Sequence, residues 1–178
     1  MFLTRLPPPS LLTLALCCAL LITGCAYQTV SHLKRKPWNP DTTEVLDMDY
    51  LRFEYMARNQ EDSLRVTGVA CPKRQPIPGW ADWIDDMWLA TYLSDDTGRV
   101  LARKFTMVTP RELDYDQCID FDFTLEPQDV GQPGPVFVSF GYRMVLTAHP
   151  YATPDPSAGE LEQEKDVFFA SESALSRF

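Results

Sequence analysis

Apolar and polar side chains alternate most regularly over residues 117–126, QCIDFDFTLE. Ile119, Phe121, Phe123 and Leu125 occupy every second position, and polar side chains stand between them. Successive side chains of a β-strand point to opposite faces of its sheet, so this spacing places the four large apolar side chains on one face. The pattern predicts a strand with one face buried against a hydrophobic core.

Other segments have the composition of strands, with β-branched and aromatic residues between turn-forming residues. They are residues 46–56, 63–71, 86–94, 99–108 and 136–148. Residues 86–94 are apolar on both faces, which is typical of a central strand. The alternation changes phase within 46–56, which predicts a bulge or, alternatively, a short amphipathic helix. Gly141 predicts a second bulge.

The connections between these segments favour antiparallel pairing. Residues 95–98, Asp-Asp-Thr-Gly, have the composition of a type I hairpin turn followed by a left-handed glycine. Short strands between turns, without a convincing long helix, predict an all-β fold, namely a single antiparallel, immunoglobulin-like sandwich of about six to seven strands. The predicted domain covers residues 46–148. Residues 149–178 are predicted to be a connector rich in proline and glutamate, with an edge strand at 166–170.

An uncharged apolar run from Leu11 to Ile22 precedes the predicted domain. As a helix this run would span about 18 Å, which is short of the ~30 Å hydrocarbon core of a bilayer. A positive charge at Arg5, a short apolar core and then small residues are typical of a secretory signal peptide. An uncleaved membrane helix is the alternative, which the polar residues after the run disfavour.

The sequence ITGC at residues 22–25 resembles the lipobox of bacterial lipoproteins, in which leucine is more usual than the isoleucine found here. The resemblance implies that residues 1–24 are removed and that fatty acyl chains on Cys25 anchor the protein in a lipid bilayer. Ala26, in place of aspartate, implies the periplasmic face of the outer membrane where the cell has one. Residues 25–45 are then expected to be a flexible tether with a reach of about 25 Å.

The charge of the chain restricts its partners. It carries 25 Asp and Glu against 16 Lys and Arg, a formal net charge of −9. Nucleic-acid binding depends on basic side chains that neutralise phosphates, so this acidic balance argues against a nucleic-acid partner. The expected partners are a lipid bilayer, through acylated Cys25, and another protein of the cell envelope.

Two cysteines remain once the leader and the lipidation site are set aside. Cys17 and Cys18 lie in the leader and Cys25 follows it, which leaves Cys71 and Cys118. In an exported protein this pair predicts a disulfide, with two buried free thiols as the alternative. Both cysteines fall on the polar face of their segments, so we expect the bridge outside the main core.

Three features between residues 63 and 125 follow one another in a characteristic order. A Gly-Val pair ends one strand, a Leu-x-Asp-x-x-Gly-x-Val-Leu hairpin follows, and an alternating aromatic strand comes last (Gly68-Val69, 93–101 and 117–126). The order resembles FxLYD-type domains, exported bacterial β-sandwiches of immunoglobulin-like shape that are often carried on lipoproteins. Thr91, Ser94 and Cys71 depart from that family's usual Phe, Tyr and Asn. The resemblance implies an interaction or structural module without catalytic residues.

The segment PIPGWADWIDDMW, residues 76–88, holds the most unusual cluster of side chains. It combines three indoles with three carboxylates: Trp80, Trp83, Trp88, Asp82, Asp85 and Asp86. In one interpretation the indoles form a lid over the end of the core. In a second they are exposed and bind a partner, because tryptophan is enriched in binding hot spots. In a third the carboxylates bind Ca²⁺, although their spacing matches no calcium loop.

An enzyme is the least favoured class. The only histidines are His32, in the predicted tether, and His149, at the start of the connector, and neither lies where a rigid scaffold would orient it. Asp120 and Asp122 share the polar face of one strand, which indicates a solvated surface. We therefore predict no catalytic residue, metal or cofactor. The leading hypothesis is a membrane-anchored binding module; the alternative is a structural or assembly factor of an envelope complex.

Overall fold

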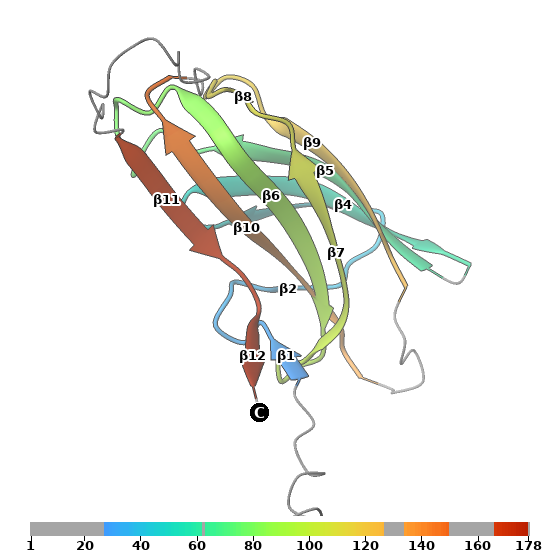
Figure 1. Cartoon of the computed structure of the whole chain (residues 1–178). Helices are drawn as coiled ribbons and strands as arrows, with labels where there is room; N and C mark the ends of the chain where they lie inside the picture. The colour runs from blue at the N-terminus through green and yellow to red at the C-terminus, as the bar shows by residue number, and fades with distance from the viewer. Residues whose placement is uncertain (1–26, 62, 127–133, 150–165, 178) are drawn as a thin grey trace, which may run out of the picture.

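The computed structural model describes residues 27–61, 63–126, 134–149 and 166–177. Within these ranges every regular element is a β-strand, and the named strands pair antiparallel. Figure 1 shows the strands arranged in two layers. The prediction of an all-β antiparallel sandwich is therefore confirmed, whereas its immunoglobulin-like type stays a prediction.

Two sheets form the sandwich. Sheet I has the order β11-β10-β6-β7, with β2 also paired to β10 and β8 to β6. Sheet II has the order β3-β4-β5-β9, and a separate ribbon pairs β1 with β12. The strands are β1 Tyr27–Thr29, β2 Lys36–Pro37, β3 Thr43–Asp47, β4 Leu51–Gln60, β5 Ser63–Pro72, β6 Trp83–Ser94, β7 Val100–Val108, β8 Arg111–Glu112, β9 Ile119–Leu125, β10 Phe137–Thr147, β11 Val167–Glu172 and β12 Leu175–Arg177.

The inward faces of the two sheets make one hydrophobic core. The four apolar side chains of β9 are all buried, as their alternation predicts. Phe53 of sheet II stacks on Phe140 of sheet I, with ring centroids 4.3 Å apart and planes 4° from parallel. Each large apolar side chain that is buried in this way contributes about 1.5–3 kcal/mol of transfer free energy. Contacts across the layers therefore hold the sheets together.

The phase change within residues 46–56 is a chain reversal, so the predicted bulge or helix is wrong. β3 ends at Asp47 and β4 begins at Leu51, and Met48 N–H donates to the Leu51 carbonyl at 2.9 Å across the turn. Leu46 on β3 and Leu51 on β4 both face the core although their positions differ in parity. Because the chain reverses between β3 and β4, the apolar side chains of both strands point into the core.

Gly141 does not form the predicted bulge. The register of β10 against β6 shifts between Val145 and Leu146 instead. A Cβ on Gly141 would lie 2.8 Å from Cε2 of Tyr92 and 2.9 Å from the carbonyl oxygen of Glu172. Glycine is needed here because Tyr92 packs directly on the strand, not because the strand bends.

The prediction of a flexible tether is wrong for residues 27–45. β1 pairs with β12, β2 pairs with β10, and Val30 and Leu33 are buried in the core. The segment lacks a long periodic pattern because it makes only the short strands β1 and β2 before β3 begins at Thr43. The fold therefore begins no later than Tyr27, while Cys25 and residues 1–24 lie outside the described residues. The predicted edge strand at 166–170 is observed as β11, paired with β10.

The predicted disulfide is present between Cys71 and Cys118. Ala70 of β5 pairs with Ile119 of β9, so the cysteines occupy the next opposed positions of two neighbouring strands. Both are only half-buried, in agreement with a bridge outside the main core.

Removal of this disulfide is expected to lower the free energy of unfolding. The bridge closes a loop with a sequence separation of 47, which corresponds to about 4 kcal/mol in the chain-entropy model. Urea denaturation of a Cys71→Ser/Cys118→Ser variant, compared with the oxidised wild type, measures the difference. A loss below about 1 kcal/mol would contradict the expectation.

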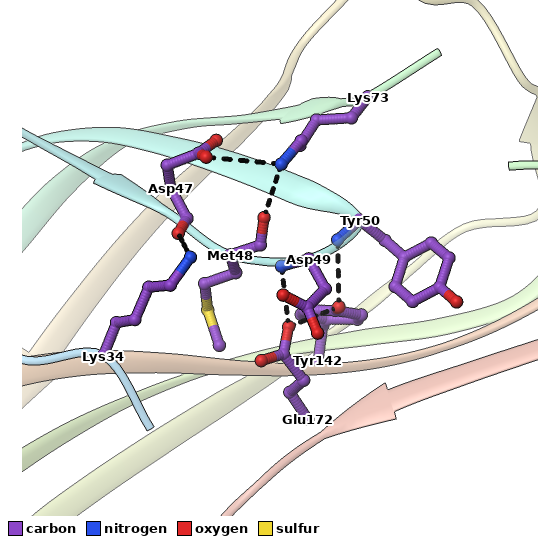
Figure 2. A network of polar contacts seen from close by, with 8 residues as sticks. All are labelled: Lys34, Asp47, Met48, Asp49, Tyr50, Lys73, Tyr142 and Glu172. Atoms are coloured by element: carbon purple, nitrogen blue, oxygen red, sulfur yellow. Dashed lines mark hydrogen bonds and ion pairs between the residues drawn. The ribbon is translucent and has the colours of Figure 1, made fainter. Parts of the chain in front are cut away.

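A polar network joins the turn between β3 and β4 to sheet I (Figure 2). The hydroxyl of Tyr142, a fully buried side chain of β10, donates to Glu172 Oε2 at 2.6 Å and accepts from the backbone N–H of Tyr50 at 3.2 Å. Glu172 Oε2 also accepts from the backbone N–H of Asp49 at 3.0 Å. Burial and the bond to Glu172 raise the pKa of Tyr142. The network fixes the turn against the neighbouring sheet.

Two lysines hold the same turn from the solvent side. Lys34 Nζ donates to the Asp47 carbonyl at 2.5 Å, and Lys73 Nζ donates to the Met48 carbonyl at 2.8 Å (Figure 2). Because Lys34 belongs to the segment between β1 and β2, this contact also ties the beginning of the fold to sheet II.

The substitution Tyr142→Phe is expected to cost about 1–3 kcal/mol, because it leaves the Tyr50 N–H without its acceptor and removes one of the two donors to Glu172 Oε2. Tyr55 supplies a matched control, since its buried hydroxyl has no hydrogen-bond partner in the described structure. Tyr55→Phe should be neutral or stabilising. Chemical denaturation of both variants measures the contrast, and equal losses would contradict the role given to the network.

Candidate interaction surface

The outward face of sheet I carries large apolar side chains that stand in solvent. Phe105 and Met107 of β7 are 66% and 61% exposed, and Val167 and Phe169 of β11 are 52% and 57% exposed. The even-numbered side chains of β10 fill the core, so those at odd positions and their cross-strand partners point outward. All four exposed side chains stand opposite outward positions.

The strand register places these side chains around β6. Trp88 lies between Met107 of β7 and Arg143 of β10. Two residues further along β10, the next row joins Phe169, Val145 and Asp86. The row after it joins Val167, Thr147 and Trp83. We call this surface the outer apolar face, and it comprises Trp83, Trp88, Phe105, Met107, Val145, Val167 and Phe169.

An ion pair lies in the middle of the outer apolar face. Arg143 Nη1 donates to Asp86 Oδ2, and the Arg143 guanidinium carbon lies 5.5 Å from the centre of the Phe169 ring. Both charged side chains remain partly exposed, so solvent screens the pair and its contribution to stability is small. The pair holds the guanidinium beside the Phe169 ring, where cation–π attraction also operates.

The outer apolar face ends where the C-terminal segment crosses sheet I. Tyr92, on the outward side of β6, is buried, and its hydroxyl accepts from the Ala174 N–H at 3.4 Å. Beside it, Arg103 Nη1 donates to Gln28 Oε1 of β1 at 2.7 Å. The outward face of sheet I is thus covered near β1 and β12 and open toward the beginning of β6.

The three tryptophans of residues 76–88 do not share one loop. Trp80 lies in the connection before β6 and is 37% exposed, whereas Trp83 and Trp88 belong to β6. Thr147 pairs with Trp83 and Arg143 with Trp88, so both indoles face outward despite their odd spacing. The register shift leaves Asp85 without a partner residue on β10, and this extra residue brings Trp83 and Trp88 to the same face. The lid interpretation therefore fails for Trp83 and Trp88, which lie on the face of a sheet.

The three carboxylates proposed for Ca²⁺ are not brought together. Asp82 makes backbone hydrogen bonds with Thr147 and Leu113, and Asp86 pairs with Arg143. Among the described residues no group of three His, Cys, Asp or Glu side chains is placed to hold a metal ion. The structure thus gives the calcium interpretation no geometric support.

The remaining candidate side chains make ordinary structural contacts. His32 Nε2 hydrogen-bonds the Ser173 carbonyl at 2.9 Å, and His149 is exposed. Asp122 forms an ion pair with Arg65 on the outward face of sheet II. The hydrogen bond from Arg65 lowers the pKa of Asp122. Asp120 and Asp122 therefore lie on a solvated surface, as their alternation predicts.

Sequence reasoning missed most of the outer apolar face. Phe105 and Met107 alternate with polar residues, a signal that normally indicates a buried face. Only the register shows that their side of β7 points away from the core. The contribution of β11 was equally hidden, because the short segment VFFA has apolar residues on both faces.

Comparisons of the chain with models of protein families, with characterised proteins and with solved structures find no match. The resemblances to bacterial lipoproteins and to FxLYD-type domains therefore remain predictions from the sequence. In the part of the chain that the structure describes, no helix has the length and apolar character needed to cross a membrane.

Proposed function

We propose that the protein is a membrane-anchored, non-catalytic binding module of the cell envelope, and that the outer apolar face binds another envelope protein. The observation that carries the proposal is that Phe105, Met107, Val167 and Phe169 are each more than half exposed on one face. Folded proteins rarely leave large apolar side chains grouped on one surface unless that surface binds something.

The composition of the outer apolar face supports a protein partner. Aromatic residues, methionine and arginine are the residue types enriched at protein interfaces, and Trp88, Met107 and Arg143 form adjacent positions of one row. Arg103 is exposed on β7 and lies on the same outward face as Phe105, although the whole chain is acidic. The partner surface that fits has an apolar centre and an acidic border beside β7.

The proposed anchor rests on the ITGC sequence at residues 22–25 and the apolar run before it. Two or three acyl chains on Cys25 would hold the protein at a bilayer for its lifetime, since one chain alone binds reversibly. A disulfide between Cys71 and Cys118 fits an exported protein.

Metabolic labelling with a fatty-acid probe tests the anchor. The wild type is expected to incorporate the probe and to fractionate with membranes, because Cys25 is the acylated residue in this proposal. Cys25→Ala is expected to do neither. Labelling that persists in Cys25→Ala, or a wild type that stays unlabelled in the soluble fraction, would contradict the anchor.

Site-specific photo-crosslinking in intact cells tests the binding surface. A photoreactive amino acid in place of Phe105 is expected to give a discrete protein adduct, because Phe105 lies on the outer apolar face. The matched control replaces Glu54, an exposed outward residue of sheet II. The adduct should disappear in a Phe169→Asp background whose thermal unfolding is unchanged.

Equal adducts from both positions, or none from Phe105, would contradict the assignment of the binding surface. Several adducts in fixed stoichiometry would instead favour the alternative class, a structural or assembly factor of an envelope complex.

A further inference from the structure

One end of the sandwich gathers both ends of the described chain. β1 pairs with β12, and the turn between β6 and β7 joins them through a bridge between Thr29 and Arg99 and a 2.8 Å hydrogen bond from Val30 N–H to the Gly98 carbonyl. Figure 1 shows β1, β12 and this turn together, away from β8. We call this region the β1–β12 end.

The β1–β12 end presents apolar side chains to solvent. Tyr27 is 40% exposed and Leu175 is 53% exposed, and they lie on the two paired strands of the ribbon. The Arg99 guanidinium carbon lies 6.0 Å from the centre of the Tyr27 ring. A tyrosine ring beside a cation is the side-chain combination that suits the boundary between lipid headgroups and acyl chains.

The charge of the β1–β12 end is opposite to that of the whole chain. Arg99, Arg103 and Arg177 lie on or beside the ribbon, and Arg35 donates to the backbone carbonyls of the turn. The acidic residues of the turn are Asp95 and Asp96; the Asp95 carboxylate accepts from Thr97 and from the Arg99 N–H. Among the described residues of the ribbon and the turn, four arginines stand against two aspartates, a local excess of positive charge in a chain of net charge −9.

The covalent chain limits how far this end can lie from an anchor at Cys25. One residue, Ala26, separates Cys25 from Tyr27, and consecutive Cα atoms are about 3.8 Å apart. The Cα atoms of Cys25 and Tyr27 are therefore at most about 7.6 Å apart. A spacer of about 25 Å, which a flexible segment over residues 25–45 would supply, does not exist in this fold.

We infer that the β1–β12 end rests on the headgroup surface of the bilayer that holds the anchor, with anionic headgroups facing its arginines. This inference rests on the proposed acylation of Cys25. The strands of sheet I then lead away from the bilayer, and the outer apolar face is reached from the side. β6 has twelve residues, so its first residue lies about 40 Å from the turn that follows it.

Quenching by headgroup-labelled lipid tests the orientation. The lipidated full-length mature protein is reconstituted in vesicles of phosphatidylethanolamine and phosphatidylglycerol that contain a lipid spin-labelled at its headgroup. A fluorophore is attached at Ser176→Cys in β12 or at Glu112→Cys in β8, both exposed positions. Glu112 pairs with Trp83, the first residue of β6, and so marks the opposite end.

The fluorophore at Ser176→Cys is expected to be quenched several-fold more strongly than that at Glu112→Cys. Equal quenching, or stronger quenching at Glu112→Cys, would overturn the orientation while a fatty-acid label on Cys25 leaves the proposed anchor standing. A chain without the fatty-acid label would overturn both. Intact thermal unfolding of both labelled variants shows that the substitutions leave the fold unchanged.

A flexible linker separates the effect of the short connection from other causes. A Gly-Ser insertion of about twenty residues between Ala26 and Tyr27 preserves the acylated cysteine and restores a spacer of about 25 Å. It is expected to abolish the difference between the two fluorophores. A difference that survives the insertion would overturn the role of the short connection.

Discussion

The burial of the segment before β3 is the constraint on which the rest of this account depends. Val30 is fully buried, Leu33 is nearly so, and Val30 N–H is hydrogen-bonded to the turn between β6 and β7. These contacts make the beginning of the described chain part of the sandwich. The pairing of β1 with β12 places the beginning of the described chain at one end of the sandwich. An anchor at residue 25 would therefore attach the domain at that end.

The two faces of sheet I differ in role: the inward face closes the core, and the proposed binding surface lies on the outward face. Its inward side chains close the core against sheet II, with Phe53 stacked on Phe140 across the layers. Its outward side is covered by the C-terminal segment near Tyr92 and is open around Trp88. Because the core is filled without the outward side chains, Phe105 and Phe169 are available for a partner without a cost in packing.

Much of the fold followed from local patterns, because alternation and turn chemistry act over a few residues. The buried face of 119–125, the hairpin turn at 95–98 and the Cys71–Cys118 bridge were predictable in this way. The contributions of Val30 and Leu33 were not, because isolated apolar residues in an irregular segment carry no period. The proposed binding surface was partly predictable: Trp83 and Trp88 stood out in the sequence, but their common face depends on a register shift that only strand pairing reveals.

Amide hydrogen exchange of the Val30 and Leu33 N–H groups tests the central claim most directly. Both are hydrogen-bonded, to the carbonyls of Gly98 and Val30 respectively, in a segment whose apolar side chains are buried. The account predicts that these amides exchange as slowly as those in the middle of β6, through the same cooperative unfolding. Exchange at the rate of an unstructured chain, with β6 protected, would show that the segment is a tether after all.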